Sequence, residues 1–267
     1  MNTNKPLRIL ITNDDGYNST GIKILEQIAR TITDDVWVVA PAEEQSGKGH
    51  ALTYRDPLRL KEVSERHYTV NGTPTDCVII ALRKLLKDHQ PDFVLSGVNN
   101  GENVAESITH SGTIGAAMEA TLHGVKAIAL SQVSMECYPT DWSVTRAYGE
   151  IVLKKVFLQE WQSNTLLNIN FPHAKEGIVQ GMRVVRHGRR SEMGGMVECL
   201  DPRGFPYYWV GVLHNEVNPP ENTDLWGAIN NFITITPIQM DLTCYRAMEN
   251  LESGLSYDFD ADMQKIA

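Results

Sequence analysis

One stretch of the sequence decides the fold class, Leu7-Arg8-Ile9-Leu10-Ile11-Thr12-Asn13-Asp14-Asp15-Gly16. Its apolar centre, residues 9–11, is mostly β-branched, which is typical of a strand buried on both faces of a parallel sheet. Gly16 interrupts this strand, and apolar residues at helical spacing follow it through residues 22–29. In open α/β sheets, ligands bind outside the carboxyl ends of the strands, which is where Asp14 and Asp15 fall. The stretch therefore predicts an α/β fold with a functional site directly after its first strand.

The two adjacent acids, Asp14 and Asp15, need an explanation, because ionised carboxylates that lie side by side repel each other. A divalent metal ion between them is the simplest cationic partner. A second interpretation stays open, in which one acid caps the following helix and the other is a solvated turn residue.

The composition is that of an ordinary globular protein, with 42% hydrophobic and 21% charged residues among 267. This length is enough for one or two domains. The formal net charge of −9 at pH 7 gives no general attraction to a nucleic-acid duplex or to an anionic membrane surface. An acidic protein that handles phosphate needs local positive charge, which a bound metal ion would supply.

The cysteines favour a reducing compartment, because they are scattered and form no CxxC pair or metal-ligand spacing. A polar start, Met1 to Pro6, precedes the first strand, and we expect no signal peptide. No apolar run approaches the roughly 18 residues that a membrane span needs, so we expect a cytoplasmic protein without a membrane partner. The four cysteines are Cys77, Cys137, Cys199 and Cys244.

Strand and helix patterns alternate through the first two-thirds of the chain. This βαβ rhythm predicts a Rossmann-like, doubly wound and mostly parallel sheet. The sequence also marks one helix start, with Thr73 as N-cap and Pro74 at the first helical position. The expected strands cover residues 9–11, 36–40, 92–96, 127–130 and 166–170, with a β excursion at 58–61 and 67–70, and the expected helices cover about 22–29, 74–86, 113–122 and 143–158.

The rhythm changes beyond Pro172, where four expected strands follow one another without intervening helices. We therefore expect a Rossmann-like catalytic core over residues 1–180 and a β-hairpin-rich C-terminal extension over residues 181–267. Strands that no helix covers leave exposed edges, which favours an oligomerisation arm and a homodimer or homotetramer. The expected strands of the extension are 182–186, 196–198, 207–212 and 232–236.

Oxygen-bearing side chains follow three of the predicted strands. Asp14 and Asp15 follow the first, Ser46 lies in the loop after the second, and Asn99 follows the strand at 92–96. The carboxyl ends of parallel strands share one rim, so these side chains can meet there. Carboxylate, hydroxyl and amide oxygens suit Mg²⁺, Mn²⁺ or Ca²⁺ and do not suit a thiolate-rich zinc site.

A second feature is the turn Ser111-Gly112-Thr113, which opens into a helix of small residues. Free backbone N–H groups and the positive end of the helix dipole suit a phosphate at this point. An ordinary Ser or Thr cap of a tightly packed helix is the alternative. No G-x-x-x-x-G-K-[ST] or G-x-G-x-x-G motif follows the first strand, which disfavours a P-loop enzyme or a dinucleotide-binding oxidoreductase.

Together these motifs resemble the SurE family of stationary-phase survival proteins, and the resemblance covers nearly the whole chain. It implies a metal-dependent phosphatase that hydrolyses nucleoside 5′- and 3′-monophosphates, with exopolyphosphatase activity in some members. It also implies a Rossmann-like core with a C-terminal arm exchanged between subunits. The motifs that carry it stand in family order: Ile11-Thr12-Asn13-Asp14-Asp15-Gly16, Val39-Ala40-Pro41 with Gln45-Ser46-Gly47, Gly72-Thr73-Pro74-Thr75-Asp76-Cys77, Ser96-Gly97-Val98-Asn99-Asn100-Gly101 and Ser111-Gly112-Thr113.

The resemblance also implies roles for individual residues. Asp14 and Asp15 are the expected catalytic residues, and one Mg²⁺ or Mn²⁺ per subunit is the expected cofactor. The expected metal ligands are Asp14, Asp15, Ser46 and Asn99. The expected substrate and phosphate contacts are Asn13, Gly47, Asn100, Ser111, Gly112 and Thr113.

Two histidines depart from the family pattern, and two other functions compete with hydrolysis. His50 stands where many relatives have Asn, and His110 where they often have Tyr; we expect both to be loop residues with local hydrogen bonds rather than general acids or bases. A receiver-like signalling domain would need a further Asp after the strand at 92–96, where the chain reads Ser96-Gly97-Val98-Asn99. A nucleotide sensor without turnover remains the other alternative.

Overall fold

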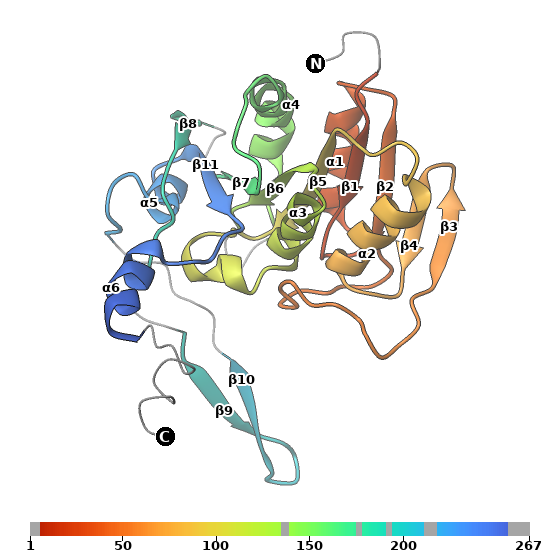
Figure 1. Cartoon of the computed structure of the whole chain (residues 1–267). Helices are drawn as coiled ribbons and strands as arrows, with labels where there is room; N and C mark the ends of the chain where they lie inside the picture. Colours follow the sequence, from red (N-terminus) through yellow and green to blue (C-terminus); the bar gives the residue numbers. More distant parts are fainter. Residues whose placement is uncertain (1–5, 135–138, 175–177, 191–193, 211–217, 256–267) are drawn as a thin grey trace, which may run out of the picture.

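A nine-stranded mixed sheet forms the centre of the protein in a computed structural model, which describes residues 6–134, 139–174, 178–190, 194–210 and 218–255 (Figure 1). Its strand order is β3-β4-β2-β1-β5-β6-β7-β11-β8, and most neighbouring pairs are parallel. The strands are β1 (Ile9–Thr12), β2 (Val36–Pro41), β3 (Leu60–Ser64), β4 (His67–Val70), β5 (Phe93–Asn100), β6 (Lys126–Gln132), β7 (Thr165–Phe171), β8 (Gly181–Val184) and β11 (Phe232–Gln239).

Helices cover both faces of this sheet, which confirms the predicted doubly wound α/β fold (Figure 1). The alternating side chains of β1 divide between two cores, because Ile9 and Ile11 pack toward α1 and α4 while Leu10 packs toward α2 and α3. All three are fully buried, and each such side chain stabilises the fold by about 1.5–3 kcal/mol. The covering helices are α1 (Thr20–Arg30), α2 (Pro74–Ile80) with its continuation η1 (Ala81–Leu85), α3 (Gly112–Leu122) and α4 (Ser143–Phe157).

The start of α2 confirms the predicted cap. The Thr73 hydroxyl accepts a hydrogen bond from the Asp76 backbone N at 3.2 Å, and the Asp76 carboxylate accepts one from the Thr73 backbone N at 2.8 Å. These two bonds satisfy backbone donors that a helix start otherwise leaves open.

β1 lies between β2 and β5 and is parallel to both. The strands that follow β1 in the sequence are added first on one side of it and then, from β5 on, on the other side, so the strand order reverses at β1. Such a reversal opens a crevice at the carboxyl ends of the two central strands. We call this side of the sheet the carboxyl edge. β5 runs on to Asn100, with a register shift between Ser96 and Asn99. The expected strand at 92–96 is therefore too short, and Asn99 and Asn100 end a strand rather than lie in a loop; the short helix η2 (Ala105–Thr109) follows.

The expectation that no helix intervenes between the strands beyond residue 172 is wrong, because α5 (Asp224–Ile229) precedes β11. A second helix, α6 (Tyr245–Leu255), follows the last strand. α5 has six residues, which is too short for the apolar positions to show a helical period. Its N-cap is Thr223, whose hydroxyl accepts a hydrogen bond from Trp226 N at 3.2 Å.

The expected strands of the extension divide between two sheets. β8 and β11 extend the main sheet, where β11 lies antiparallel to β7 and parallel to β8. β9 (Met196–Leu200) and β10 (Pro206–Val210) form an antiparallel hairpin that projects away from the main sheet (Figure 1). Residues 211 and 212 of an expected strand lie outside the described residues, and the division of the chain at residue 180 stays a prediction. Across the described ranges, no helix combines the length and apolar character needed to cross a bilayer.

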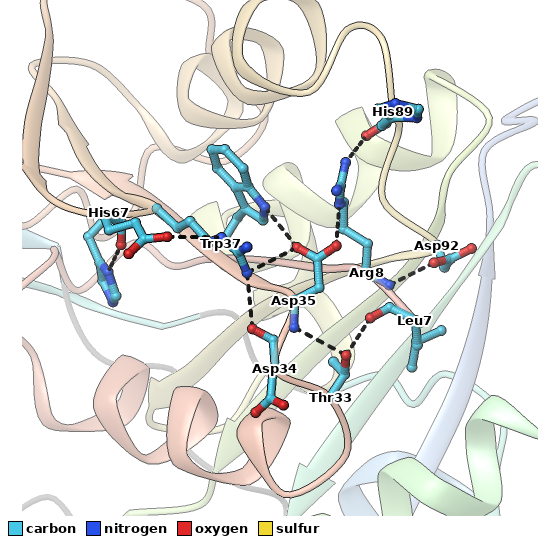
Figure 2. Close-up of polar contacts among 11 residues, drawn as sticks. Leu7, Arg8, Thr33, Asp34, Asp35, Trp37, His67, His89 and Asp92 are labelled. Carbon is cyan, nitrogen blue, oxygen red and sulfur yellow. Dashed lines mark hydrogen bonds and ion pairs between the residues drawn. The ribbon is translucent and has the colours of Figure 1, made fainter. Parts of the chain in front are cut away.

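The opposite side of the sheet, at the amino ends of β1 and β2, carries a cluster of paired charges (Figure 2). Asp35 lies at its centre, 2.8 Å from Arg8 Nε, 3.4 Å from Arg66 Nη1 and 3.1 Å from the indole N of Trp37. The Asp92 carboxylate accepts a hydrogen bond from the Arg8 backbone N at 2.7 Å. We call Arg8, Asp35, Trp37, Arg66 and Asp92 the amino-edge cluster.

Candidate functional site

Asp14 lies at the carboxyl edge directly after β1 and is 3% exposed. The hydroxyl of Thr113, in the first turn of α3, donates a hydrogen bond to its Oδ1. A side-chain carbon at Gly112 would lie 2.8 Å from Asp14 Cβ, which is too close for any residue but glycine. The predicted acid and the predicted phosphate turn are therefore in direct contact, although they lie far apart in the sequence.

The electrostatic surroundings of the two acids are unfavourable to negative charge. Burial raises the pKa of Asp14, although hydrogen bonds from Thr113 and from the Gly112 backbone oppose the shift. Burial, followed by the charge of Asp14, raises the pKa of Asp15 to about 6, while the Asn100 backbone N–H at 3.1 Å opposes the shift and Glu44 adds to it. A cation placed beside both carboxylates would relieve this repulsion.

The turn between the acids and α1 is held by Asn13, which is fully buried. Its amide N donates hydrogen bonds to Gly16 O at 2.9 Å and to Ser19 Oγ at 2.8 Å. Gly16 has φ +88°, and a side-chain carbon there would lie 3.2 Å from the backbone carbonyl carbon of Glu43. Asn13 Oδ1 has no hydrogen-bond partner among the described residues. The amide group of Asn13 therefore shapes the turn, and its predicted contact with substrate stays a prediction.

The loop after β2 is tied to the acid pair through its backbone. Gln45 N donates a hydrogen bond to Asp14 O at 2.7 Å. The Ser46 hydroxyl is exposed and donates to Glu44 Oε1 at 3.0 Å, and Gly47 has φ +75° with open space around its Cα. The structure thus places this loop beside the acids, while the predicted roles of Ser46 and Gly47 as ligand and substrate contact stay predictions.

The end of β5 brings Asn100 to the acids more closely than Asn99. The backbone N of Asn100 contacts Asp15, and its side-chain Oδ1 accepts a hydrogen bond from the Thr140 hydroxyl. Asn99 is half-buried and donates its amide N to Gly101 O at 2.8 Å. That bond leaves the Asn99 carbonyl oxygen as the group that could coordinate a metal.

The start of α3 fits both interpretations of the Ser111 turn. The Ser111 hydroxyl caps the helix by accepting a hydrogen bond from Ile114 N at 3.1 Å, as the alternative interpretation expects. Thr113 instead contacts Asp14, so the same turn also presents the helix start to the acid pair.

A pocket of about 440 Å³ opens from Asp15 along the carboxyl edge. Asp15, Glu44 and Asn100 line one part of it. The start of α1 with its N-cap (residues 19–21) and the segment before α4 (Pro139, Thr140 and Trp142) line the rest. No lysine or arginine is among the described residues that line it. Sequence patterns give no sign of this pocket, because Trp142 lies far along the chain from the acids.

The family model described as "Survival protein SurE" matches residues 9–193 of the chain, which include all the predicted site residues. The chain belongs to the SurE family. It is 45% identical to the 5′-nucleotidase SurE of Parvibaculum lavamentivorans over 254 residues, which cover 94% of this chain and 92% of that protein. It is 48% identical to the 5′-nucleotidase SurE of Erythrobacter litoralis over 243 residues, which cover 89% and 95% of the two chains.

A solved SurE structure shares the fold. The crystal structure of the SurE protein from Aquifex aeolicus matches with a TM-score of 0.81 and 36% sequence identity, covering 92% of this chain and 98% of that one. The family resemblance of the sequence is thereby confirmed, and so is the SurE-like architecture.

The two unusual histidines of this SurE chain lie in loops, as expected, but the side chain of His50 makes a long-range contact in place of the expected local one. His50 Nε2 is 2.9 Å from a carboxylate oxygen of Glu119, and His123 Nε2 is 3.1 Å from the other. The hydrogen bond from His50 is the largest cause that lowers the pKa of Glu119. His110 accepts a hydrogen bond through its backbone O from Gly49 N at 3.0 Å. Sequence patterns do not indicate the contact between His50 and Glu119, because the two residues lie 69 positions apart. They indicate only the pair of Glu119 and His123, which stand at helical spacing.

Proposed function

We propose that this SurE-family chain is a divalent-metal-dependent 5′-nucleotidase, which hydrolyses nucleoside 5′-monophosphates to nucleoside and phosphate. The observation that carries the proposal is the acid pair at the reversal point of the sheet, where Asp14 meets the start of α3 and Asp15 meets the end of β5. The names of the two SurE relatives support the same activity.

The residues at the carboxyl edge fit a hard divalent cation. Asp14 and Asp15 supply two carboxylates with raised pKa values, and Ser46 and Asn99 supply further oxygen atoms. This donor set suits one Mg²⁺ or Mn²⁺ per subunit. Among the described residues, no group of three His, Cys, Asp or Glu side chains could hold a metal, so the hydroxyl and amide donors are needed to complete the proposed site. When bound, the ion supplies Lewis-acid polarisation of a phosphoryl oxygen and lowers the pKa of a bound water.

The protein's own groups position the phosphate. The start of α3, Ser111 to Thr113, offers backbone N–H groups and the positive end of a helix dipole to the phosphoryl oxygens. Asn13, Gly47 and Asn100 complete the proposed contacts around it. Because Asp14 is held by Thr113, the carboxylate and the helix start keep a fixed relation while negative charge develops on the phosphoryl group.

The substrate is a single phosphomonoester in this proposal. The pocket beside Asp15 contains two acids and no cationic side chain among its described lining residues, so it gives no support to the extra charges of a triphosphate. We expect nucleoside monophosphates to be cleaved faster than nucleoside triphosphates. The extension of the proposal to 3′-monophosphates and short polyphosphate rests on the family resemblance alone and not on the charge of this pocket.

The test is phosphate release from a panel of 5′- and 3′-nucleoside monophosphates, ATP and short polyphosphate, with Mg²⁺, with Mn²⁺ and after EDTA treatment. The expected result is turnover of monophosphates that EDTA abolishes and added metal restores. Binding without phosphate release would instead favour a nucleotide sensor. Turnover that survives EDTA would contradict the metal site.

The proposed assembly is a homodimer or homotetramer, which rests on apolar surface at the end of the chain. An isolated two-stranded hairpin is only marginally stable in water, yet Trp209 and Val210 on β10 are 64% and 90% exposed. α6 also exposes apolar residues at helical spacing, among them Tyr245, Met248 and Leu255. Light scattering checks this proposal, and a stable monomer at micromolar concentration would contradict it.

A reducing, cytoplasmic location belongs to the proposal as well, supported by the free thiols of Cys77, Cys199 and Cys244.

A further inference from the structure

Trp142 forms a wall of the pocket that begins at Asp15. It is the N-cap residue of α4 and is half-buried, with its inner side against the core shared by α1 and α4. Its role is not that of a helix cap, because its side chain makes no capping hydrogen bond. The indole N–H has no hydrogen-bond partner among the described residues. A large aromatic side chain with an unused donor thus lines a pocket next to the proposed metal site.

The edge of this indole lies against the backbone of α1 at Gly21. A side-chain carbon at Gly21 would lie 3.1 Å from Trp142 Cη2 and only 1.8 Å from the carbonyl oxygen of Val98. Glycine is therefore required at position 21, and its bare Cα leaves the room in which the edge of the indole lies. An aromatic wall held in this way does not need to be ordered when a ligand binds, which favours affinity.

The charge and size of the pocket indicate which part of a substrate it takes. Asp15 and Glu44 are acidic, and no described lining residue is cationic, so a second phosphate group would be repelled. The remaining lining consists of hydroxyl, amide and aromatic side chains together with Gly21 and Pro139, which suits an uncharged group with hydrogen-bonding edges. A volume of about 440 Å³ is within the usual range of small-molecule pockets and is large enough for a nucleoside.

We propose that this pocket is the nucleoside subsite and that Trp142 stacks on the base, so that purine nucleotides are preferred over pyrimidine nucleotides. This inference rests on the proposed function, because it places the phosphate of the same substrate at the acid pair. Every base presents a flat π-face, and the larger purine face covers more of an indole. Trp142 is then a specificity-determining residue for a reaction whose phosphate end is held elsewhere.

The test compares Trp142→Leu and Trp142→Phe with the wild-type holoenzyme and with Trp161→Phe as a matched control. Trp161 packs against the same core but donates its indole N–H to Thr165 O at 3.0 Å and does not line the pocket. Two substrates are used, AMP and ribose 5-phosphate, which carries the phosphate and sugar without a base. Adenosine is titrated by calorimetry as a binding probe that requires no turnover.

For Trp142→Leu we expect kcat/KM for AMP to fall about tenfold or more, the scale of one lost base–aromatic stack, with ribose 5-phosphate unchanged. Adenosine affinity should fall by the same factor, Trp142→Phe should lose less, and Trp161→Phe should retain both activities. An equal fall for AMP and ribose 5-phosphate, or adenosine binding that Trp142→Leu does not weaken, would overturn the inference while leaving the nucleotidase proposal intact. Trp142-dependent adenosine binding without any phosphate release would overturn the nucleotidase proposal and keep the nucleoside subsite.

Discussion

The amino edge and the carboxyl edge of the central sheet both carry buried or half-buried acids. The two edges differ in whether cationic side chains compensate the negative charge of these acids. At the amino edge, Asp35 lies between two guanidinium groups and an indole N–H (Figure 2). At the carboxyl edge, Asp14 and Asp15 receive hydroxyl and amide hydrogen bonds, and no described lysine or arginine forms an ion pair with either. Within the described residues, one edge satisfies its negative charge and the other leaves it to be satisfied by something that binds.

This difference separates the groups that hold the fold together from the groups that act. Ligands of doubly wound sheets bind at the carboxyl ends of the strands, so repulsion between acids is useful there and would only destabilise the protein at the other edge. The same substitution, Asp to Asn, should therefore have opposite consequences at the two edges.

The largest effect is expected on activity at the carboxyl edge. Asp15→Asn keeps the shape of the side chain and removes one charge from the proposed metal site. Loss of one such electrostatic element commonly lowers the rate on the order of 10²-fold or more. In metal-free buffer the melting temperature should be equal to or higher than that of the wild type, because Asp14 then has no charged neighbour at this position. Near-normal turnover of the variant, or a clearly lower melting temperature, would break the comparison.

The second effect is expected on stability at the amino edge. Asp35→Asn removes the ion pairs that the Asp35 carboxylate forms with Arg8 and Arg66. The side chains of all three residues are only partly exposed to solvent. We expect a loss of about 1–3 kcal/mol in the free energy of unfolding, or about 2–4 °C in melting temperature for each kcal/mol. Thermal and urea unfolding measure this loss, and kcat/KM for AMP should stay within about twofold of wild type because Asp35 lies outside the site. A variant with unchanged stability and reduced activity would reverse the roles that we assign to the two edges.

The smallest effect concerns pH in the metal-free protein. Folding raises the pKa of Asp15 from 3.8 to about 6, so the folded protein binds this proton more tightly than the unfolded chain does. Protonated Asp15 therefore contributes about 1–3 kcal/mol to the free energy of unfolding. This contribution is complete below about pH 4 and is lost as the pH rises toward and through 6. The difference in unfolding free energy between wild type and Asp15→Asn should therefore change over this pH range, and added Mg²⁺ should offset the loss at pH 7. Asp35→Asn is the control, since it should keep the wild-type dependence that comes from Asp15; a flat difference between wild type and Asp15→Asn would refute the repulsion.

The parts of the fold and site that depend on neighbouring residues could be predicted from the sequence. The buried strand before Asp14, the cap at Thr73 and the helix start at Ser111 are all local patterns of apolar spacing or turn chemistry. The position of β1 among parallel strands then implied that the acids and the later turns share one edge, and the Thr113–Asp14 contact agrees with this.

The parts that depend on long-range packing could not be predicted in this way. Asp35 finds Arg8 and Arg66 only when β1, β2 and the turn before β4 come together, and each residue alone resembles an ordinary surface charge. Gly97 interrupts the apolar run of β5, so the strand pattern stops before Asn99 although the pairing with β6 continues. The short helix α5 packs on β11 and has no sequence periodicity of its own.

The strand order at the far end of the sheet also sets the order in which the chain can be assembled. β8 is paired with β11 and with no other described strand of the main sheet, and β11 lies between β7 and β8. During synthesis, β8 therefore leaves the ribosome before the strand that will receive it exists. The residues around the acid pair, from β1 to the start of α3, are complete well before that moment. A nascent chain can thus form its reactive edge early, while the last two strands of the sheet must wait for residues 232–239 and close as a pair.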